Sequence, residues 1–88
     1  MLYQNSIYFY KAWKYENPKI RLAPCDKVPE FILDGVKHGY LFMNWNCLII
    51  CFDGRTWNPA KCGDWIVKDG SHFLVFNEIE FNKNFKTS

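Results

Sequence analysis

Length, composition and charge already limit what this chain can be. It has 88 residues, of which 49% are hydrophobic and 19% aromatic, and its formal net charge is +2. This length predicts a single domain over residues 1–88, and the high apolar content excludes a disordered tail. The small charge is spread along the chain without basic clusters, which argues against nucleic acid as a partner.

The sequence also predicts no contact with a membrane. No run of about 18 or more apolar residues occurs, so we expect no transmembrane helix. Residues 1–5 lack the basic start and the apolar run of a signal peptide. We therefore expect a protein of the cytoplasm.

The four cysteines are Cys25, Cys47, Cys51 and Cys62. On one strand, Cys47 and Cys51 would lie about 13 Å apart, which is too far for a disulfide. No C-x-x-C pair occurs, and the two histidines, His38 and His72, are not at the spacing of metal ligands. The sequence predicts buried free thiols, with no metal and no cofactor.

The first half of the chain predicts a strand followed by a helix. Residues 6–15 are rich in aromatic side chains and read as a strand. A helix is predicted over 29–38, because Pro29 suits the first helical position and apolar residues follow at helical spacing. Gly39 suits the left-handed cap at the end of this helix.

The middle of the chain predicts three strands joined by turns. Residues 40–43 read as a short strand, and the uninterrupted apolar run 47–52 is typical of a central strand buried on both faces. The pair Asp53-Gly54 predicts a tight turn. Pro59 either ends the return strand or places it on a sheet edge.

The C-terminal part predicts a second hairpin and a short helix. The hairpin joins strands 65–68 and 72–76, and the helix over 77–85 begins with a capping box formed by Asn77 and Glu80. Together the elements predict an α+β fold. It has one small, mostly antiparallel sheet of about five to six strands, one packed helix (29–38) and a short C-terminal helix (77–85).

The tripeptide Gly63-Asp64-Trp65 allows a functional and a structural interpretation. In the functional one, the Asp64 carboxylate beside the Trp65 indole binds a cation or a polar ring. In the structural one, Gly63 supplies a positive φ, Asp64 caps the turn and Trp65 enters the core. We favour the structural interpretation, because such a turn requires this chemistry in any case.

The sequence contains no recognisable active site, and we predict that the chain is not an enzyme. Cys62, next to Lys61, is the most reactive candidate nucleophile, but no base, orienting group or oxyanion site accompanies it. The carboxylates lie at turns and helix starts, where capping explains them. No Gly-rich phosphate loop occurs.

The first strand carries aromatic side chains on both of its faces. The face with Phe9, Lys11, Trp13 and Tyr15 is either a platform for stacking bases or core beneath the helix 29–38, and we favour core. The opposite face then presents Tyr8, Tyr10 and Lys14 to solvent or to a partner. The candidate partner-binding residues are these three together with Trp45, Trp57 and Arg55.

Four segments of the chain, taken together and in this order, resemble the sequence motifs of a known group of proteins. They are the aromatic strand Phe9 to Tyr15, the helix start Val28-Pro29-Glu30-Phe31, the apolar strand and turn Leu48 to Gly54, and the C-terminal Gly63-Asp64-Trp65-Ile66 hairpin followed by Glu78-Ile79-Glu80-Phe81. In this order they resemble a family of small bacteriophage and prophage proteins, mostly of unassigned function. The resemblance covers roughly residues 7–86. It departs from the family pattern at Cys62, where the family has proline, and it brings no catalytic residues.

The resemblance implies a phage-encoded protein in the host cytoplasm. Our first hypothesis is a binding protein that inhibits a host protein or defence complex, as an anti-CRISPR protein does. The alternative is a small-molecule binder, such as a sponge for a nucleotide immune signal, with Arg21, Arg55 or Lys68 as basic groups. A binder of single-stranded nucleic acid is less favoured, because the charge is modest. The partner and the oligomeric state stay open.

Overall fold

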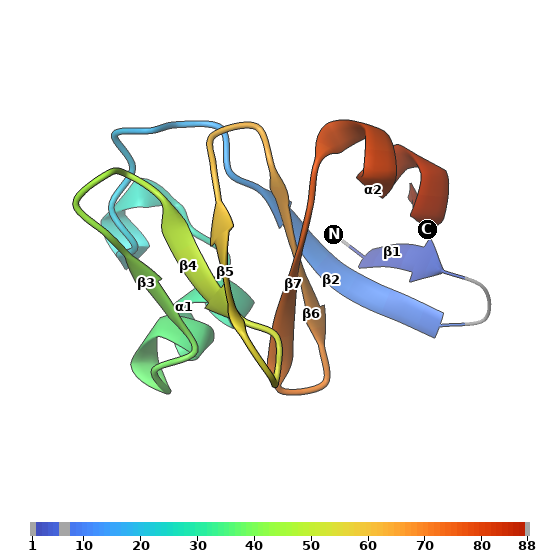
Figure 1. Cartoon of the computed structure of the whole chain (residues 1–88), viewed down its shortest axis with the longest axis horizontal. Coiled ribbons are helices and arrows are strands. Elements are labelled where there is room, and N and C mark those ends of the chain that lie inside the picture. Colours follow the sequence, from blue (N-terminus) through green and yellow to red (C-terminus); the bar gives the residue numbers. More distant parts are fainter. Residues whose placement is uncertain (1, 6–7, 88) are drawn as a thin grey trace.

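The fold contains two antiparallel sheets (Figure 1). The computed structural model describes residues 2–5 and 8–87. The larger sheet has the strand order β7-β6-β2-β1-β8, and the smaller one has the order β3-β4-β5. The larger sheet consists of β1 (Leu2–Asn5), β2 (Tyr8–Lys14), β6 (Trp65–Asp69), β7 (His72–Phe76) and β8 (Lys86–Thr87). The smaller sheet consists of β3 (Leu41–Met43), β4 (Ile49–Phe52) and β5 (Trp57–Ala60), and the helices are η1 (Pro24–Asp26), α1 (Glu30–Lys37) and α2 (Glu78–Asn84).

The α+β class is confirmed, but the prediction of one sheet is wrong. After β5 the chain returns to the end of β2, where the Gly63 N–H donates to the Tyr15 carbonyl at 2.6 Å and the Tyr15 N–H donates to the Asp64 carbonyl at 2.9 Å. These bonds place β6 beside β2 instead of beside β5. Strand β5 lies next to β7 in space, yet the two are edges of different sheets (Figure 1). Pro59 lies within β5, so the edge alternative is the correct one.

The strands at the two ends of the chain were not predicted. β1 pairs with β2 on one side and with β8 on the other. Both segments are short and lack the alternation of apolar and polar residues that identifies a strand in a sequence. The predicted strand 6–15 corresponds to β2 from Tyr8 onward, and residues 6–7 lie outside the described part of the chain.

The predicted helix 29–38 corresponds to α1. Pro29 is its N-cap and not its first helical residue, and Gly39 follows the helix with φ +81°, as a left-handed cap requires. The buried side of α1 carries Phe31 and Ile32, together with Gly35. These residues turn α1 toward the main core of the molecule.

Two separate cores lie on opposite faces of the larger sheet, because consecutive strand residues point to opposite faces. Ile66 belongs to the main core and Val67 to the second core. The buried residues of the main core are Tyr15, Val28, Phe31, Ile32, Leu41, Ile49, Cys51, Ala60, Ile66 and Phe73. Those of the second core are Ala12, Val67, Phe81 and Phe85, the last two from α2 and its C-terminal end.

The Gly63-Asp64-Trp65 turn has the structural role that we favoured. Gly63 has φ +102°, and the buried Asp64 carboxylate accepts a hydrogen bond from the Lys61 N–H at 3.0 Å. The Trp65 ring stacks on Phe81 with 3.9 Å between ring centroids. The tryptophan therefore packs in the second core beneath α2, whose predicted capping box is confirmed.

The prediction of buried thiols is wrong for three cysteines. Cys51 is buried, whereas Cys25, Cys47 and Cys62 are exposed, and all four are free. Cys47 does not extend the strand: it lies in the turn before β4 with φ +62°. The strand itself is buried on one face only, since Ile49 and Cys51 are covered while Ile50 and Phe52 are half-buried.

We expect three thiols to react with Ellman's reagent in the folded protein, and the fourth only after unfolding. Burial raises the pKa of the Cys51 thiol to about 12, which keeps it protonated and shielded. The measurement is a thiol titration in buffer and then in urea, with a Cys51→Ala variant to assign the slow thiol. Equal reaction rates for all four thiols would contradict the burial of Cys51.

Candidate functional site

The side of the smaller sheet that faces away from the main core is apolar. Residues directly opposite each other in an antiparallel pair share a face. In one row across the sheet, Phe42 lies opposite Ile50, and Ile50 lies opposite Pro59. In the next row on the same face, Phe52 lies opposite Trp57. Tyr40 extends that next row, because its carbonyl accepts from the Phe52 N–H at 3.0 Å. We call this surface the outer aromatic face; it consists of Tyr40, Phe42, Ile50, Phe52, Trp57 and Pro59.

The outer aromatic face is open to solvent. Phe42 is 47% exposed and Trp57 is 48% exposed. The Trp57 ring centroid lies 5.6 Å from that of Phe42 and 5.0 Å from that of Phe52. An antiparallel sheet with one covered face normally carries polar side chains on the other. This face instead exposes an apolar patch on the order of 300–400 Å², a size that is often functional.

The turn at one end of β4 holds Trp45 in solvent. The Asn44 side-chain oxygen accepts from the N–H groups of Asn46 and Leu48, both at 2.9 Å. The buried Tyr15 hydroxyl donates to the Cys47 carbonyl at 2.7 Å. These bonds fix the turn, and Trp45 is 90% exposed at its tip.

The turn at the other end of β4 is organised by Asp53. Its carboxylate accepts from the N–H groups of Thr56 and Arg55, both at 2.8 Å, and from the Asn58 amide at 2.9 Å. These bonds lower the pKa of Asp53 to about 2 from the ordinary 3.8. Arg55 is exposed at the edge of the outer aromatic face, at the opposite end of β4 from Trp45.

We expect Asp53 to make the stability of the protein depend on pH below 4. A depressed folded-state pKa stabilises the fold fully above the unfolded pKa of 3.8, and this contribution is lost as the pH falls toward about 2. Urea unfolding at several pH values should therefore show a fall in unfolding free energy that is smaller in Asp53→Asn. Asp69→Asn is the control, because Asp69 is exposed in the β6–β7 hairpin. Identical pH profiles for wild type and Asp53→Asn would contradict this role.

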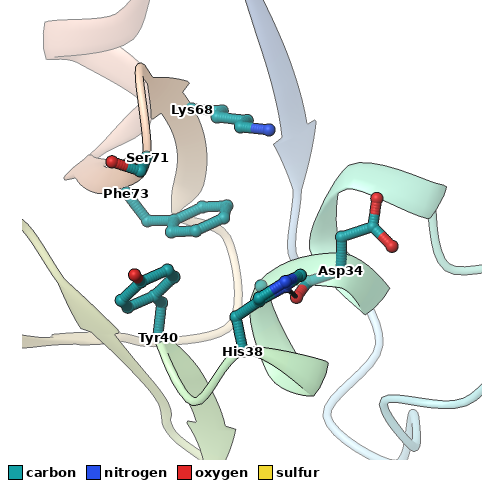
Figure 2. A pocket seen from close by; sticks show the side chains of 7 residues that line it. Asp34, His38, Tyr40, Lys68, Ser71 and Phe73 are labelled. Carbon is teal, nitrogen blue, oxygen red and sulfur yellow. Dashed lines mark hydrogen bonds between the residues drawn. The ribbon is translucent and has the colours of Figure 1, made fainter.

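A pocket of about 280 Å³ lies beside the outer aromatic face, between α1 and the β6–β7 hairpin (Figure 2). Figure 2 shows the Phe73 ring at its centre, Lys68 on one side, and Tyr40 and His38 on another. Tyr40 also belongs to the outer aromatic face, and its ring stacks between His38 and Phe52 at 6.4 Å from each. The remaining lining residues are Asp34, Gly35 and Ser71.

The predicted partner-binding residues fall into two groups. Trp45, Trp57 and Arg55 lie on the outer aromatic face or on the turns beside it. Tyr10 and Lys14 lie under α2, where the Tyr10 ring contacts Phe85 at 5.7 Å. The side chain of Tyr8 lies outside the part of the chain that the structure describes.

The prediction that Tyr10 and Lys14 face open solvent is therefore wrong. The Lys14 ammonium lies 2.8 Å from a Glu78 carboxylate oxygen, and the same oxygen accepts from the Trp65 indole N–H at 3.1 Å. The physical reason is the second core, because α2 covers the face of β2 that we expected to be free.

On the other face of β2, the predicted stacking platform is core at Trp13 and Tyr15, as we favoured, whereas Lys11 is exposed and the side chain of Phe9 lies outside the described part of the chain. Tyr15 is fully buried, and Trp13 packs against the main core. Of the three basic residues named for a small ligand, Lys68 alone lines the pocket. Arg21 pairs with Asp26 at 3.3 Å, and Arg55 lies on the Asp53 turn.

The sequence reasoning missed Tyr40, Phe42 and Phe52. Their signal was present, because these residues alternate with buried ones along β3 and β4. The continuous apolar composition of 47–52 concealed this period of two.

Comparison with known proteins returned no match among protein-family models, curated proteins or solved structures. No helix in residues 2–5 and 8–87 is long and apolar enough to cross a membrane. Within the same residues, no group of three His, Cys, Asp or Glu side chains is placed to hold a metal ion.

Proposed function

We propose that this chain is a protein-binding module and that the outer aromatic face is its recognition surface. The observation that carries the proposal is the exposed apolar side of the β3-β4-β5 sheet, at positions where polar side chains are the norm. Tryptophan and arginine are the residue types that most often dominate binding energy at interfaces. Trp57 supplies an anchor within the face, and Trp45 and Arg55 supply anchors at its two ends.

The partner is a different protein and not a second copy of the chain. Two outer aromatic faces stacked on each other would bury on the order of 600–800 Å², about half of a standard interface. A larger protein can cover the face together with the turns that hold Trp45 and Arg55, which lie at the two ends of β4, and so bury more area than the face alone provides.

In the setting that the family resemblance implies, the module acts in a phage-infected cell. Its partner is then a host protein or a defence complex, which it inhibits by covering a functional surface. The absence of an active site among the residue patterns of the sequence agrees with inhibition by binding.

The test compares a double variant of the face with a matched control. Phe42→Ser/Trp57→Ser removes the two most exposed rings of the face, and Ile79→Ser removes an apolar side chain that is 69% exposed on α2. We expect wild type and Ile79→Ser to retain the same stoichiometric host partner on affinity capture and to restore phage plating on the defended host. The double variant should lose both properties while its melting temperature stays close to that of wild type.

Two results would overturn the proposal. One is equal capture and plating by the double variant and wild type. The other is a wild-type dimer in sedimentation that Phe42→Ser/Trp57→Ser converts to a monomer, because the face would then join two copies of the chain.

A further inference from the structure

The pocket between α1 and the β6–β7 hairpin contains a cationic group whose charge is not balanced by a direct ion pair. Lys68 projects into it from β6 and is half-buried. Within residues 2–5 and 8–87, the ion pairs are Lys14–Glu78 and Arg21–Asp26, and Lys68 takes part in neither. Lys11 lies directly opposite Lys68 on the neighbouring strand. Like charges in this position repel each other unless an anion lies close to them.

The other walls of the pocket supply an apolar surface. Phe73 is almost fully buried behind the pocket, and the Tyr40 ring faces the same space (Figure 2). Ser71 also lines the pocket from the hairpin turn, but Figure 2 shows its hydroxyl pointing away from the Lys68 ammonium group. Gly35 brings the backbone of α1 close to Phe73, since a Cβ atom there would lie 2.6 Å from the ring. The pocket therefore combines an apolar surface formed by Tyr40 and Phe73 with the ammonium group of Lys68.

One acidic side chain, Asp34, also lines the pocket and opposes this charge. It is exposed on α1, whereas Lys68 is half-buried, so the carboxylate is better screened by water than the ammonium group. His38 adds no negative charge, because its ring is either neutral or positive. Its Nδ1 lies 2.8 Å from the Asp34 carbonyl oxygen. Lys11 is also exposed and is screened in the same way, so the half-buried Lys68 is the charge that favours an anion in the pocket.

We propose that this pocket binds a small organic anion, a carboxylate or phosphate attached to a planar apolar group. Lys68 holds the anionic group, and Tyr40 and Phe73 line the apolar part of the site. The anion has two possible sources, a free small molecule or an acidic side chain of a protein docked on the adjoining outer aromatic face. The pocket's preference for an anion does not depend on the protein-binding proposal.

The first experiment titrates the isolated chain with benzoate and with inorganic phosphate, followed by NMR chemical shifts. We expect saturable shifts at the pocket residues, with benzoate bound more tightly because it also contacts the rings. Lys68→Gln should weaken benzoate binding at least about fivefold, as expected for loss of a charge-assisted contact. Asp34→Asn should strengthen it about two- to threefold, since a repelling charge is removed.

Lys83→Gln is the matched control, because Lys83 lies on α2 against the opposite face of the larger sheet. It should bind benzoate as wild type does. Equal binding by Lys68→Gln and wild type, with both variants folded by NMR, would overturn the proposal. Weaker binding by Asp34→Asn would also overturn it, because the pocket would then require a ligand of both charges.

A second experiment identifies the source of the anion. Saturating benzoate is added to the host-partner capture described above. Release of the partner assigns the anion to an acidic side chain of that protein, and an unchanged complex assigns it to a free small molecule. A failure of partner capture leaves the NMR titration unaffected, so the two proposals fail separately.

Discussion

Replacing Tyr15 by alanine is expected to lower the free energy of unfolding by about 3–5 kcal/mol. Tyr15 is fully buried in the main core, and its backbone joins the end of β2 to the loop before β6. Its removal leaves a cavity where the two sheets meet. Because a domain of this size has only about 5–10 kcal/mol of net stability, much of the variant should be unfolded at 37 °C. Urea unfolding followed by tryptophan fluorescence measures the change.

The variant Tyr15→Phe separates the ring from its hydroxyl group. It keeps the packing but loses the 2.7 Å hydrogen bond to the Cys47 carbonyl, for an expected cost of about 1–2 kcal/mol. If both variants had the stability of wild type, Tyr15 would not be the link between the larger sheet and the Trp45 turn.

Replacing Gly35 by valine is expected to destabilise the protein by about 3 kcal/mol, and alanine by about 1–2 kcal/mol. A Cβ atom at Gly35 would lie 2.6 Å from Phe73 and 2.8 Å from Leu41. Both of these side chains are almost fully buried, so neither moves without disturbing the main core. The clash outweighs the gain in helix propensity of about 1 kcal/mol that alanine offers over glycine.

The control for Gly35 is Gly39→Ala at the end of the same helix. Nothing lies within 4 Å of a Cβ atom at Gly39, so this change tests backbone strain at φ +81° without any clash. We expect a cost of about 1 kcal/mol from it. Thermal melting of the three glycine variants checks the order, and a stabilising Gly35→Ala would contradict the close packing of α1.

Local chemistry made most of the elements predictable. The helix start at Pro29, the cap at Gly39 and the capping box of Asn77 and Glu80 are determined by residues within one turn of the chain. The β6–β7 hairpin and the positive φ of Gly63 follow from turn chemistry in the same way.

Pairing between distant strands was less predictable. Whether β6 pairs with β5 or with β2 depends on bonds between Tyr15 and the Gly63-Asp64 turn, which lie far apart in sequence. The prediction that Tyr10 and Lys14 face solvent failed for the same reason, because no neighbouring residue in the sequence indicates that α2 covers them. Trp45, Trp57 and Arg55 are exposed, as residues in turns and on edge strands are in most folds.

Along β3, β4 and β5, residues that are buried in the main core alternate with residues on the outer aromatic face. Leu41, Ile49, Cys51 and Ala60 face inward and maintain the fold, while the neighbouring positions face outward. Outward positions therefore tolerate replacement at little cost to folding. If the outer aromatic face is the recognition surface that we propose, a library randomised at 42, 50, 57 and 59 would sample new specificities on an unchanged framework.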